Sequence, residues 1–229
     1  MALILHIETA TDVCSVALAS DGALMDEMHA TEARSHATQL TLLIEKICKQ
    51  HSVSYSSLDA VAVSKGPGSY TGLRIGVATA KGLCYALEKP LIAVNTLESF
   101  THELLLQKNN IANKLSSADL FCPMIDARRM EVYCALFNQQ KEFVRETKAE
   151  ILTVQSFAEE LQKHKIVFFG DGASKCKSFL QHQTNAVFID DFFPSARGQI
   201  EIASNAFQQN NFEDIAYFEP FYLKEFVSH

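Results

Sequence analysis

The chain has 229 residues, of which 48% are hydrophobic, and carries 20 Lys and Arg against 27 Asp and Glu for a formal net charge of −7 at pH 7. Such a length and apolar content suit one large or two small domains with packed cores, and no apolar run approaches the roughly 20 residues of a membrane span. Autonomous nucleic-acid binding is not expected, because no Lys/Arg cluster of the kind that neutralises several phosphates is present.

The first half of the chain alternates strand and helix patterns in the order βββαβαβα. Three strand-like runs precede Ser35–Gln50, whose apolar residues fall on one helix face, with Ser35 placed to cap it. A strand, a glycine-rich turn with its helix, a further strand and a further helix follow. The predicted strands are Leu3–Ile7, Val13–Ala19, Ala23–Thr31, Ala60–Val63 and Leu91–Val94, and the other predicted helices are Leu73–Leu87 and Leu97–Gln107.

A polar stretch, residues 108–118, is typical of a linker, and the same pattern then starts again. An ungapped offset of 118 pairs Ile7 with Ile125 and Glu8 with Asp126. The sequence therefore predicts a duplicated α/β fold with an N-terminal subdomain 1–107 and a shortened C-terminal subdomain 119–229. The second half is expected to contain strands Phe121–Asp126, Val132–Phe137, Glu142–Ala149 and Ile166–Phe169, helices Val154–His164 and Gln199–Phe207, and a docked aromatic tail.

The segment SKGPGSYTGLRIGVATAKGL, residues 64–83, holds five of the nine glycines at one strand-to-helix junction. It lacks the Lys-Ser/Thr pair of a Walker A loop and the spacing of a dinucleotide fingerprint. Within its helix, small residues recur every four positions, at Gly72, Gly76, Ala80 and Cys84. This stripe predicts close packing, either against the chain's own sheet or against a helix of a partner.

Two tandem units of this kind resemble the superfamily of actin, the sugar kinases and the heat-shock chaperone ATPases. Two carboxylates in that architecture hold magnesium at nucleotide phosphates, which Glu8 and Asp126 could do here. The alternative is that both acids end their strands by bonding nearby N–H groups, or Arg128 and Arg129. The residues assigned to such a cleft, in vestigial form, are Glu8, Thr9, Asp126, Gly170 and Gly172.

Other chemistry has little support in the sequence. His36 is followed four residues later by Leu40, so it has no second histidine on its helix face, and no metal site or other cofactor is expected. Ser69 does not lie in a G-x-S-x-G elbow. The six cysteines are far apart, never as C-x-x-C, and are expected to be reduced core residues in a cytoplasmic protein without a membrane span.

The chain resembles the bacterial TsaB (YeaZ) family of the tRNA threonylcarbamoyladenosine pathway. The resemblance rests on ILHIETATDVCSVAL at residues 4–18, RSHATQLTLLIEKI at 34–47, the glycine segment, IDARRMEVYCALF at 125–137 and FEPFYLKEF at 218–226. It covers the whole chain in order.

The resemblance implies a non-catalytic scaffold and dimerization subunit. Its partner is TsaD, which transfers the threonylcarbamoyl group to N6 of adenosine 37 in tRNAs that read ANN codons, and the ATPase TsaE joins the pair. TsaD carries two metal-binding histidines on its first long helix, of which this chain keeps only the position of His36. A homodimer is expected when the chain is alone, with tRNA reached only through the complex.

The resemblance also places the partner interface on the helices Ser35–Gln50 and Leu73–Leu87. Leucine at Gly76 or Ala80 is then expected to leave the monomer folded but to abolish pairing. The alternative function is a small ATP-hydrolysing or phosphotransferase enzyme that uses Glu8 and Asp126 with magnesium. The predicted interface residues are His36, Leu40, Leu43, Ile47, Tyr70, Gly72, Leu73, Gly76, Ala80 and Leu83.

Overall fold

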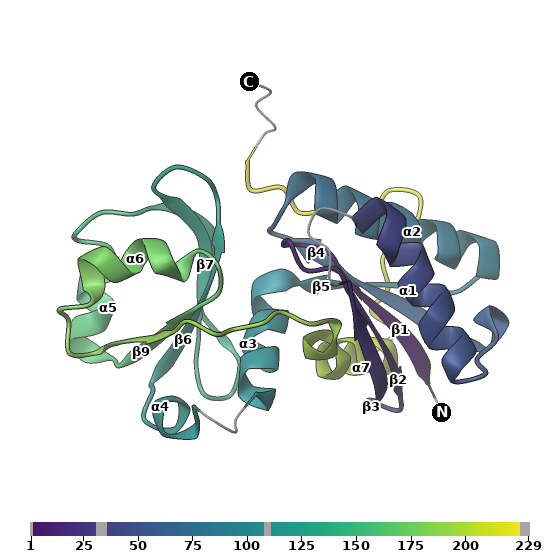
Figure 1. The fold of residues 1–229 in the computed structure, drawn as a ribbon, viewed down its shortest axis with the longest axis horizontal. Coiled ribbons are helices and arrows are strands. Elements are labelled where there is room, and N and C mark those ends of the chain that lie inside the picture. The colour runs from purple at the N-terminus through teal and green to yellow at the C-terminus, as the bar shows by residue number, and fades with distance from the viewer. Residues whose placement is uncertain (1, 31–35, 108–110, 225–229) are drawn as a thin grey trace. The chain divides into compact units, whose positions relative to one another are not determined.

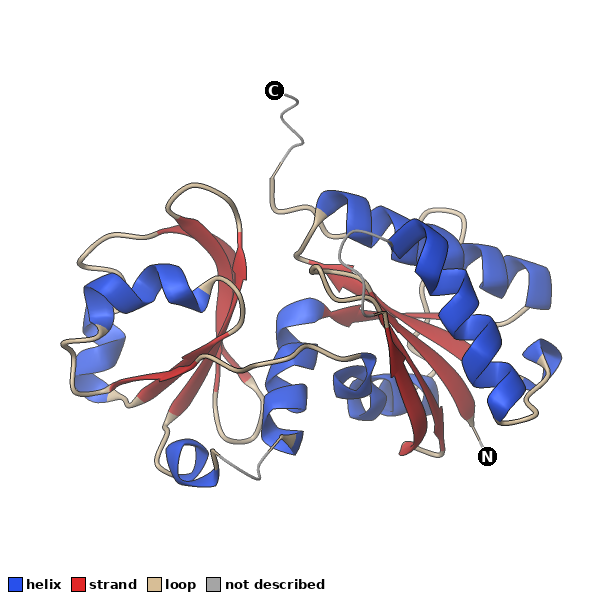
Figure 2. Ribbon diagram, in the orientation of Figure 1, coloured by secondary structure: helices blue, strands red, loops and turns tan. Residues whose placement is uncertain are grey.

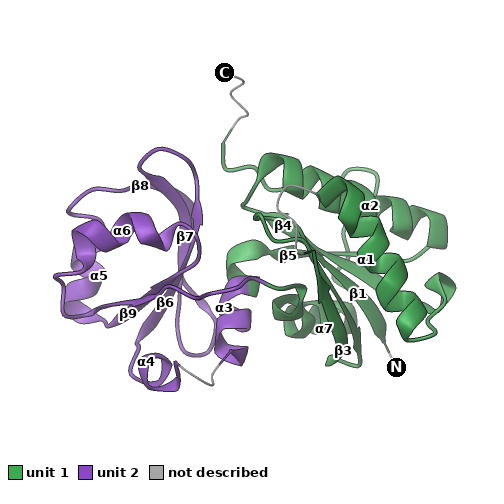
Figure 3. Ribbon diagram, viewed as in Figure 1, with its two compact units in different colours: residues 1–99, 195–229 green, residues 100–194 purple. Residues whose placement is uncertain are grey.

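The computed structural model describes residues 2–30, 36–107 and 111–224 (Figure 1). The chain forms two compact units, one made of residues 1–99 and 195–229 and the other of residues 100–194 (Figure 3). Each unit is built on a five-stranded sheet with helices beside it (Figure 2).

The sheet of the first unit has the strand order β3-β2-β1-β4-β5. The strands β1, β2 and β3 form an antiparallel meander, and β4 and β5 extend it in parallel. Its strands are β1 (Leu3–Glu8), β2 (Ser15–Ser20), β3 (Ala23–His29), β4 (Ala60–Gly66) and β5 (Leu91–Asn95), and its helices are α1 (His36–Gln50), η1 (Tyr55–Ser57), α2 (Tyr70–Leu87), η3 (Ala196–Gln199) and α7 (Ile200–Gln208).

The sheet of the second unit, read from its other edge, has the equivalent order β8-β7-β6-β9-β10. The repeat predicted from the offset of 118 is confirmed, because Glu8 ends β1 and Asp126 ends β6. The elements that follow the first unit's sheet are α3 (Thr96–Leu106), α4 (Ala112–Ser116), β6 (Leu120–Asp126), β7 (Glu131–Phe137), β8 (Phe143–Ile151), α5 (Ala158–Lys163), β9 (Ile166–Phe169), α6 (Ala173–Leu180) and β10 (Ala186–Ile189). The helices α4 and α6 and the short strand β10 were not predicted.

The two faces of the first sheet pack against different helices. Leu5 and Ile7 point to the face that α1 and α2 cover, in one apolar cluster. Ile4 points to the opposite face, where it packs with Ala203 of α7. All six cysteines are free and buried, as predicted. Within the described ranges, no helix combines the length and apolar character needed to cross a membrane.

The structure divides the chain differently from the predicted 1–107, 108–118 and 119–229. Residues 195–229 group with the first unit, and the predicted linker contains α4 where it is described. Two backbone hydrogen bonds hold the C-terminal segment on the first sheet. The Glu213 N–H donates to Leu91 O at 2.9 Å, and the Phe221 N–H donates to Lys65 O at 2.6 Å. Hydrogen bonds between residues so far apart in sequence leave no local pattern.

The helix α2 begins at Tyr70, three residues before the predicted start. Ser69 caps it by accepting a hydrogen bond from the Gly72 N–H at 3.3 Å, so this hydroxyl has a structural role. The predicted N-cap of α1, Ser35, lies outside the described residues.

The small-residue stripe of α2 packs against the chain's own backbone. A Cβ atom at Gly72 would collide with the Thr9 carbonyl oxygen, and one at Gly76 with the Thr9 hydroxyl. Ala80 is fully buried. The stripe Gly72, Gly76, Ala80 and Cys84, called the inner stripe below, is therefore closed within the monomer, and leucine at Gly76 or Ala80 would disrupt this packing.

We predict that Gly72→Ala lowers the free energy of unfolding by roughly 1–3 kcal/mol, because the Thr9 carbonyl oxygen is fixed by the strand end and cannot move aside. The matched control is Gly82→Ala on the same helix, where an added Cβ meets nothing within 4 Å and alanine should stabilise the helix by about 0.5–1 kcal/mol. Urea unfolding of both variants measures the difference, and equal effects would contradict the assignment of the inner stripe.

Candidate functional site

Glu8 lies at the end of β1 and is sealed by its own chain. The side chain is fully buried, and its Oε1 accepts a hydrogen bond from the Ala10 N–H at 2.7 Å. Its Oε2 accepts a hydrogen bond from the Ser64 hydroxyl of β4. The expectation that this acid bonds a nearby N–H group is confirmed.

Gln199 closes this site from the returning segment. Its Nε2 donates to Ile7 O at 2.8 Å and to Ser64 Oγ at 2.9 Å. Its Oε1 is buried without a partner in the described chain. Burial raises the pKa of the Glu8 carboxyl above its ordinary 4.5, although the hydrogen bonds from Ser64 and Ala10 oppose that shift. A buried carboxyl with a raised pKa is not exposed as a ligand for a magnesium ion from solvent.

His6 lies on the same strand, two residues before Glu8, and is also fully buried. Neither ring nitrogen has a hydrogen-bond partner within the described chain. Burial lowers the pKa of this imidazole to about 3, so it is neutral at physiological pH. His6 therefore brings no charge to the end of β1.

Asp126 occupies the equivalent position in the second unit but is exposed. Its Oδ1 accepts hydrogen bonds from the Arg128 N–H and from Lys175 Nζ, both at 2.6 Å. Lys175 also donates to the carbonyl oxygens of Arg129 and Glu131, which fixes the ammonium group beside the carboxylate. Asp126 is thus neutralised by a lysine of its own unit.

The two glycines assigned to the cleft bring the start of α6 onto β6. Gly170 has a φ of 95° and lies so close to Met124 that a Cβ would collide with the Met124 carbonyl oxygen. A Cβ at Gly172 would lie 2.9 Å from the Ile125 carbonyl carbon. In the other unit, Thr9 meets Gly72 and Gly76 in the same way. The glycines of both units thus serve strand-to-helix packing.

The residues predicted to hold a partner are mostly core residues of this chain. His36 is partly buried, and its Nε2 lies 2.9 Å from Thr11 O. Tyr70 and Leu83 are also partly buried. The predicted interface residues that are instead buried in the monomer are Leu40, Leu43, Ile47, Gly72, Leu73, Gly76 and Ala80. Where the chain is described, no three His, Cys, Asp or Glu side chains gather as metal ligands.

The helices α1 and α2 also have a face that is exposed to solvent in this chain. On α1, Leu42 is 56% exposed, and on α2, Tyr85 is 81% exposed. Gly82 lies in the interior of α2, with nothing within 4 Å of an added Cβ. The exposed residues that follow one face of α2, called the outer stripe below, are Thr71, Arg74, Ala78, Gly82 and Tyr85.

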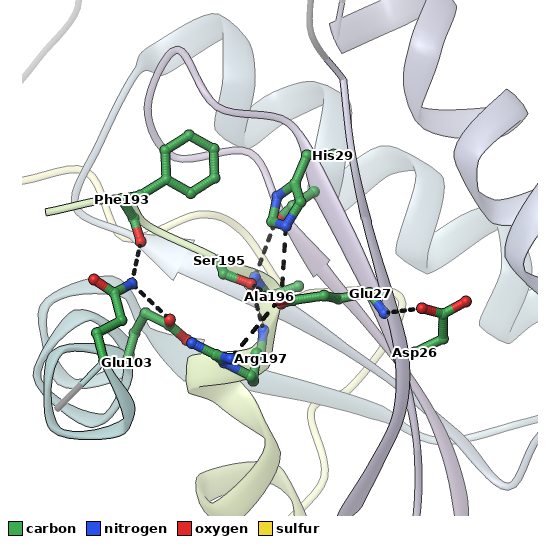
Figure 4. Close-up of polar contacts among 10 residues, drawn as sticks. Asp26, Glu27, His29, Glu103, Phe193, Ser195, Ala196 and Arg197 are labelled. Atoms are coloured by element: carbon green, nitrogen blue, oxygen red, sulfur yellow. Dashed lines mark hydrogen bonds and ion pairs between the residues drawn. The ribbon is translucent and has the colours of Figure 1, made fainter. Parts of the chain in front are cut away.

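A polar cluster fixes the point where the chain re-enters the first unit (Figure 4). Ser195 Oγ donates to Glu27 Oε2 at 2.6 Å, and Arg197 Nη1 lies 3.8 Å from Glu27 Oε1. The Ala196 N–H donates to Ser15 Oγ at 2.8 Å. Ser195 is buried, and its hydrogen bond to Glu27 ties the returning segment to β3.

Comparisons with known proteins agree with this geometry. The family model for TsaD, tRNA N6-adenosine threonylcarbamoyltransferase, matches residues 28–226. The tRNA threonylcarbamoyladenosine biosynthesis protein TsaB of Escherichia coli (strain K12) is 30% identical over 232 residues, 98% of this chain and 96% of that protein.

Solved structures also match this chain over nearly its whole length. YeaZ from Pseudomonas aeruginosa superposes with a TM-score of 0.79 and 26% identity over 97% of this chain and all of that one. The activator of the 2-hydroxyisocaproyl-CoA dehydratase from Clostridium difficile, with bound ADPNP, has a TM-score of 0.51 and 8% identity over 93% of this chain and 98% of its own. The second likeness concerns the fold alone, and it agrees with the predicted duplicated α/β fold.

We predict that Glu27 makes folding sensitive to acid. Its hydrogen bond with His29, followed by those from Ser195 and the charge of Arg197, lowers the pKa of Glu27 to about 2. Because the folded pKa lies below the ordinary 4.5, the stabilisation is complete above pH 4.5 and is lost as the pH falls toward 2. Glu27→Gln should cost about 1 kcal/mol near neutral pH, a modest value because solvent screens this partly exposed group.

The measurement is urea unfolding of wild type and Glu27→Gln between pH 7 and pH 2. The matched control is Glu159→Gln on an exposed face of α5, which should follow wild type at every pH. The difference between wild type and Glu27→Gln should shrink toward pH 2, and a difference that stays constant would contradict the assignment.

Proposed function

We propose a specific role for this chain, which belongs to the TsaB family of tRNA threonylcarbamoyladenosine biosynthesis proteins. It is the non-catalytic scaffold subunit of the complex that modifies adenosine 37 of ANN-decoding tRNAs in the cytoplasm. It pairs with a TsaD subunit that carries out the chemistry, and TsaE joins the pair. Contact with tRNA occurs through the assembled complex, because the net charge of −7 does not favour autonomous binding of phosphates.

The observation that carries the proposal is the outer stripe of α2. Glycine in the interior of an exposed helix destabilises it by about 0.5–1 kcal/mol relative to alanine. Apart from its chain neighbours and the backbone of its own helix, no heavy atom of the described chain lies within 4 Å of a Cβ added to Gly82, so no packing contact accounts for this glycine. The approach of a second helix over Gly82 and Ala78 supplies a reason for both small residues.

The surroundings of Gly82 suit a protein partner. Tyr85 and Leu42 expose large apolar side chains on the same two helices. Tyrosine and arginine are enriched at the centres of protein interfaces. Two helices from each subunit can supply the roughly 1,600 Å² that a stable interface buries in total. The chain alone is expected to form a homodimer through the same faces.

The alternative, a small phosphotransferase, is not favoured by the two carboxylates. Glu8 is enclosed by Ser64, Ala10 and Gln199, and Asp126 is paired with Lys175. Neither acid is presented as a free ligand for magnesium. The scaffold role makes no demand on either.

We predict that Gly82→Leu abolishes co-elution with TsaD in gel filtration, because the leucine side chain would fill the space that the partner helix needs. The monomer should remain folded, since the position is open in the chain itself. Gly82→Ala is the matched control and should retain pairing, at most with a moderate loss of affinity. Unchanged co-elution of Gly82→Leu would overturn the assigned interface.

The same variant can be tested in the reaction. Reconstituted modification of an ANN-decoding tRNA, with TsaD and TsaE present throughout, should require this chain and should fail with Gly82→Leu. Full modification without the chain would contradict the scaffold role.

We predict no ATP hydrolysis by the purified chain alone with magnesium, because Glu8 is sealed and Asp126 is neutralised. A release of phosphate that Asp126→Asn stops would replace the scaffold role with the phosphotransferase alternative. Lys175→Met is measured beside it, because this variant removes the lysine that pairs with Asp126 and leaves the carboxylate itself unchanged.

A further inference from the structure

The side chain of Arg74 is held in place by its own chain while part of it stays free. It projects from the outer stripe of α2, and its Nε–H donates to the Tyr222 hydroxyl at 3.2 Å. Its guanidinium carbon lies 4.1 Å from the centre of the Tyr70 ring. The rings of Tyr70 and Tyr222 are themselves 5.0 Å apart between centroids.

The C-terminal segment supports this arrangement from behind. The Phe221 N–H donates to Lys65 O at 2.6 Å, which fixes the residue before Tyr222 against the end of β4. Lys81 Nζ donates to Phe218 O at 2.8 Å, which ties the same segment to α2. Arginine side chains on a helix surface normally sample many rotamers. The hydrogen bond to Tyr222, the contact with the Tyr70 ring and the contact between those two rings remove much of that freedom.

The two Nη groups of Arg74 are the part that stays free. In the described chain neither forms a hydrogen bond or an ion pair, and Glu219 contributes only a longer-range attraction. With Nε occupied by Tyr222, the Nη groups are the remaining donors of the guanidinium. A fixed guanidinium edge with unused donors matches the two oxygens of a carboxylate or a phosphate.

We propose that Arg74 is a specificity-determining residue of the subunit interface, where its Nη groups bind a carboxylate side chain of the paired subunit. This inference rests on the proposed pairing through the outer stripe. It assigns one charged contact to the outer stripe, whose other members are uncharged.

A protein carboxylate fits the surroundings better than an RNA phosphate. The neighbours of Arg74 along the outer stripe are Thr71, Ala78, Gly82 and Tyr85, none of which is charged. Phosphate-backbone surfaces use several cations in a row, and this chain has a net charge of −7. A single arginine among apolar and small side chains is typical of a protein interface centre.

The affinity for separately purified TsaD subunit, measured by biolayer interferometry, tests the proposal. Arg74→Ala should weaken binding at least roughly tenfold, and Arg74→Lys nearly as much, because lysine keeps the charge but cannot present two parallel donors. Tyr222→Phe should weaken binding by a smaller factor, because the ring remains while the group that orients Nε is lost. Arg128→Lys, an exposed arginine of the second unit, is the matched control and should bind as wild type does.

Salt dependence and charge reversal separate a carboxylate contact from simple packing. The loss of affinity between 50 and 500 mM salt should be smaller for Arg74→Ala than for wild type. Arg74→Glu should abolish binding, and one Asp→Arg or Glu→Arg variant of the partner should restore it.

Binding of Arg74→Ala and Arg74→Lys within twofold of wild type would overturn the assignment, even with the pairing itself intact. Unchanged subunit affinity together with loss of tRNA crosslinking to the complex would also overturn it and would assign Arg74 to RNA. Failure of the wild-type chain to bind TsaD at all would instead refute the proposed function, so the two failures are distinguishable.

Discussion

The fold of the first unit depends on a close contact between a helix and the end of a strand. Gly72 and Gly76 let α2 lie directly on the Thr9 backbone and hydroxyl, just after β1, where the Ser69 N–H donates to Ala10 O at 2.7 Å. This contact sets the rotation of α2 about its axis. Once the inner stripe faces the strand end, the outer stripe must face away from the sheet, and Gly82 and Arg74 are exposed with it.

The same contact explains why the acid at the end of β1 is not open to solvent. The turn after β1 is pinned under α2, and Glu8 is enclosed by Ala10, Ser64 and Gln199. In the second unit the corresponding glycines pack on Met124 and Ile125, but Asp126 stays exposed and pairs with Lys175. The two units thus share their strand order while their acids have different environments. The side chains around each strand end, and not the shared strand order, determine the environment of each acid.

Sequence periodicity predicted most elements within a few residues, because alternation in strands and one-sided apolar faces in helices are local signals. The rotation of α2 was not predicted, because small residues lie on both of its faces. One available signal distinguished them: Leu73 and Val77 accompany the inner stripe, whereas Arg74 and Tyr85 accompany the outer one. The mixture of large apolar with small residues marks the face toward the sheet.

Contacts between distant segments could not be predicted from the sequence. The closure of the Glu8 site by Gln199 and the hydrogen bond from Arg74 to Tyr222 join residues more than 100 positions apart, and no spacing rule relates such pairs. For the same reason, the sequence did not predict that residues 195–229 belong to the first unit. An aromatic tail predicts docking, but its hydrogen bonds to β4 and β5 determine where it docks.

Thiol labelling tests the central claim, that the inner stripe is closed within the chain while the outer stripe binds the sister subunit. The six native cysteines are buried, so Ala78→Cys would add one reactive thiol on the outer stripe and Lys163→Cys a control thiol on α5. Both should react rapidly with a maleimide when the chain is diluted until it is monomeric. Saturating TsaD should protect the thiol at position 78 by more than tenfold and leave that at position 163 unchanged, whereas equal labelling of both in the complex would contradict the account.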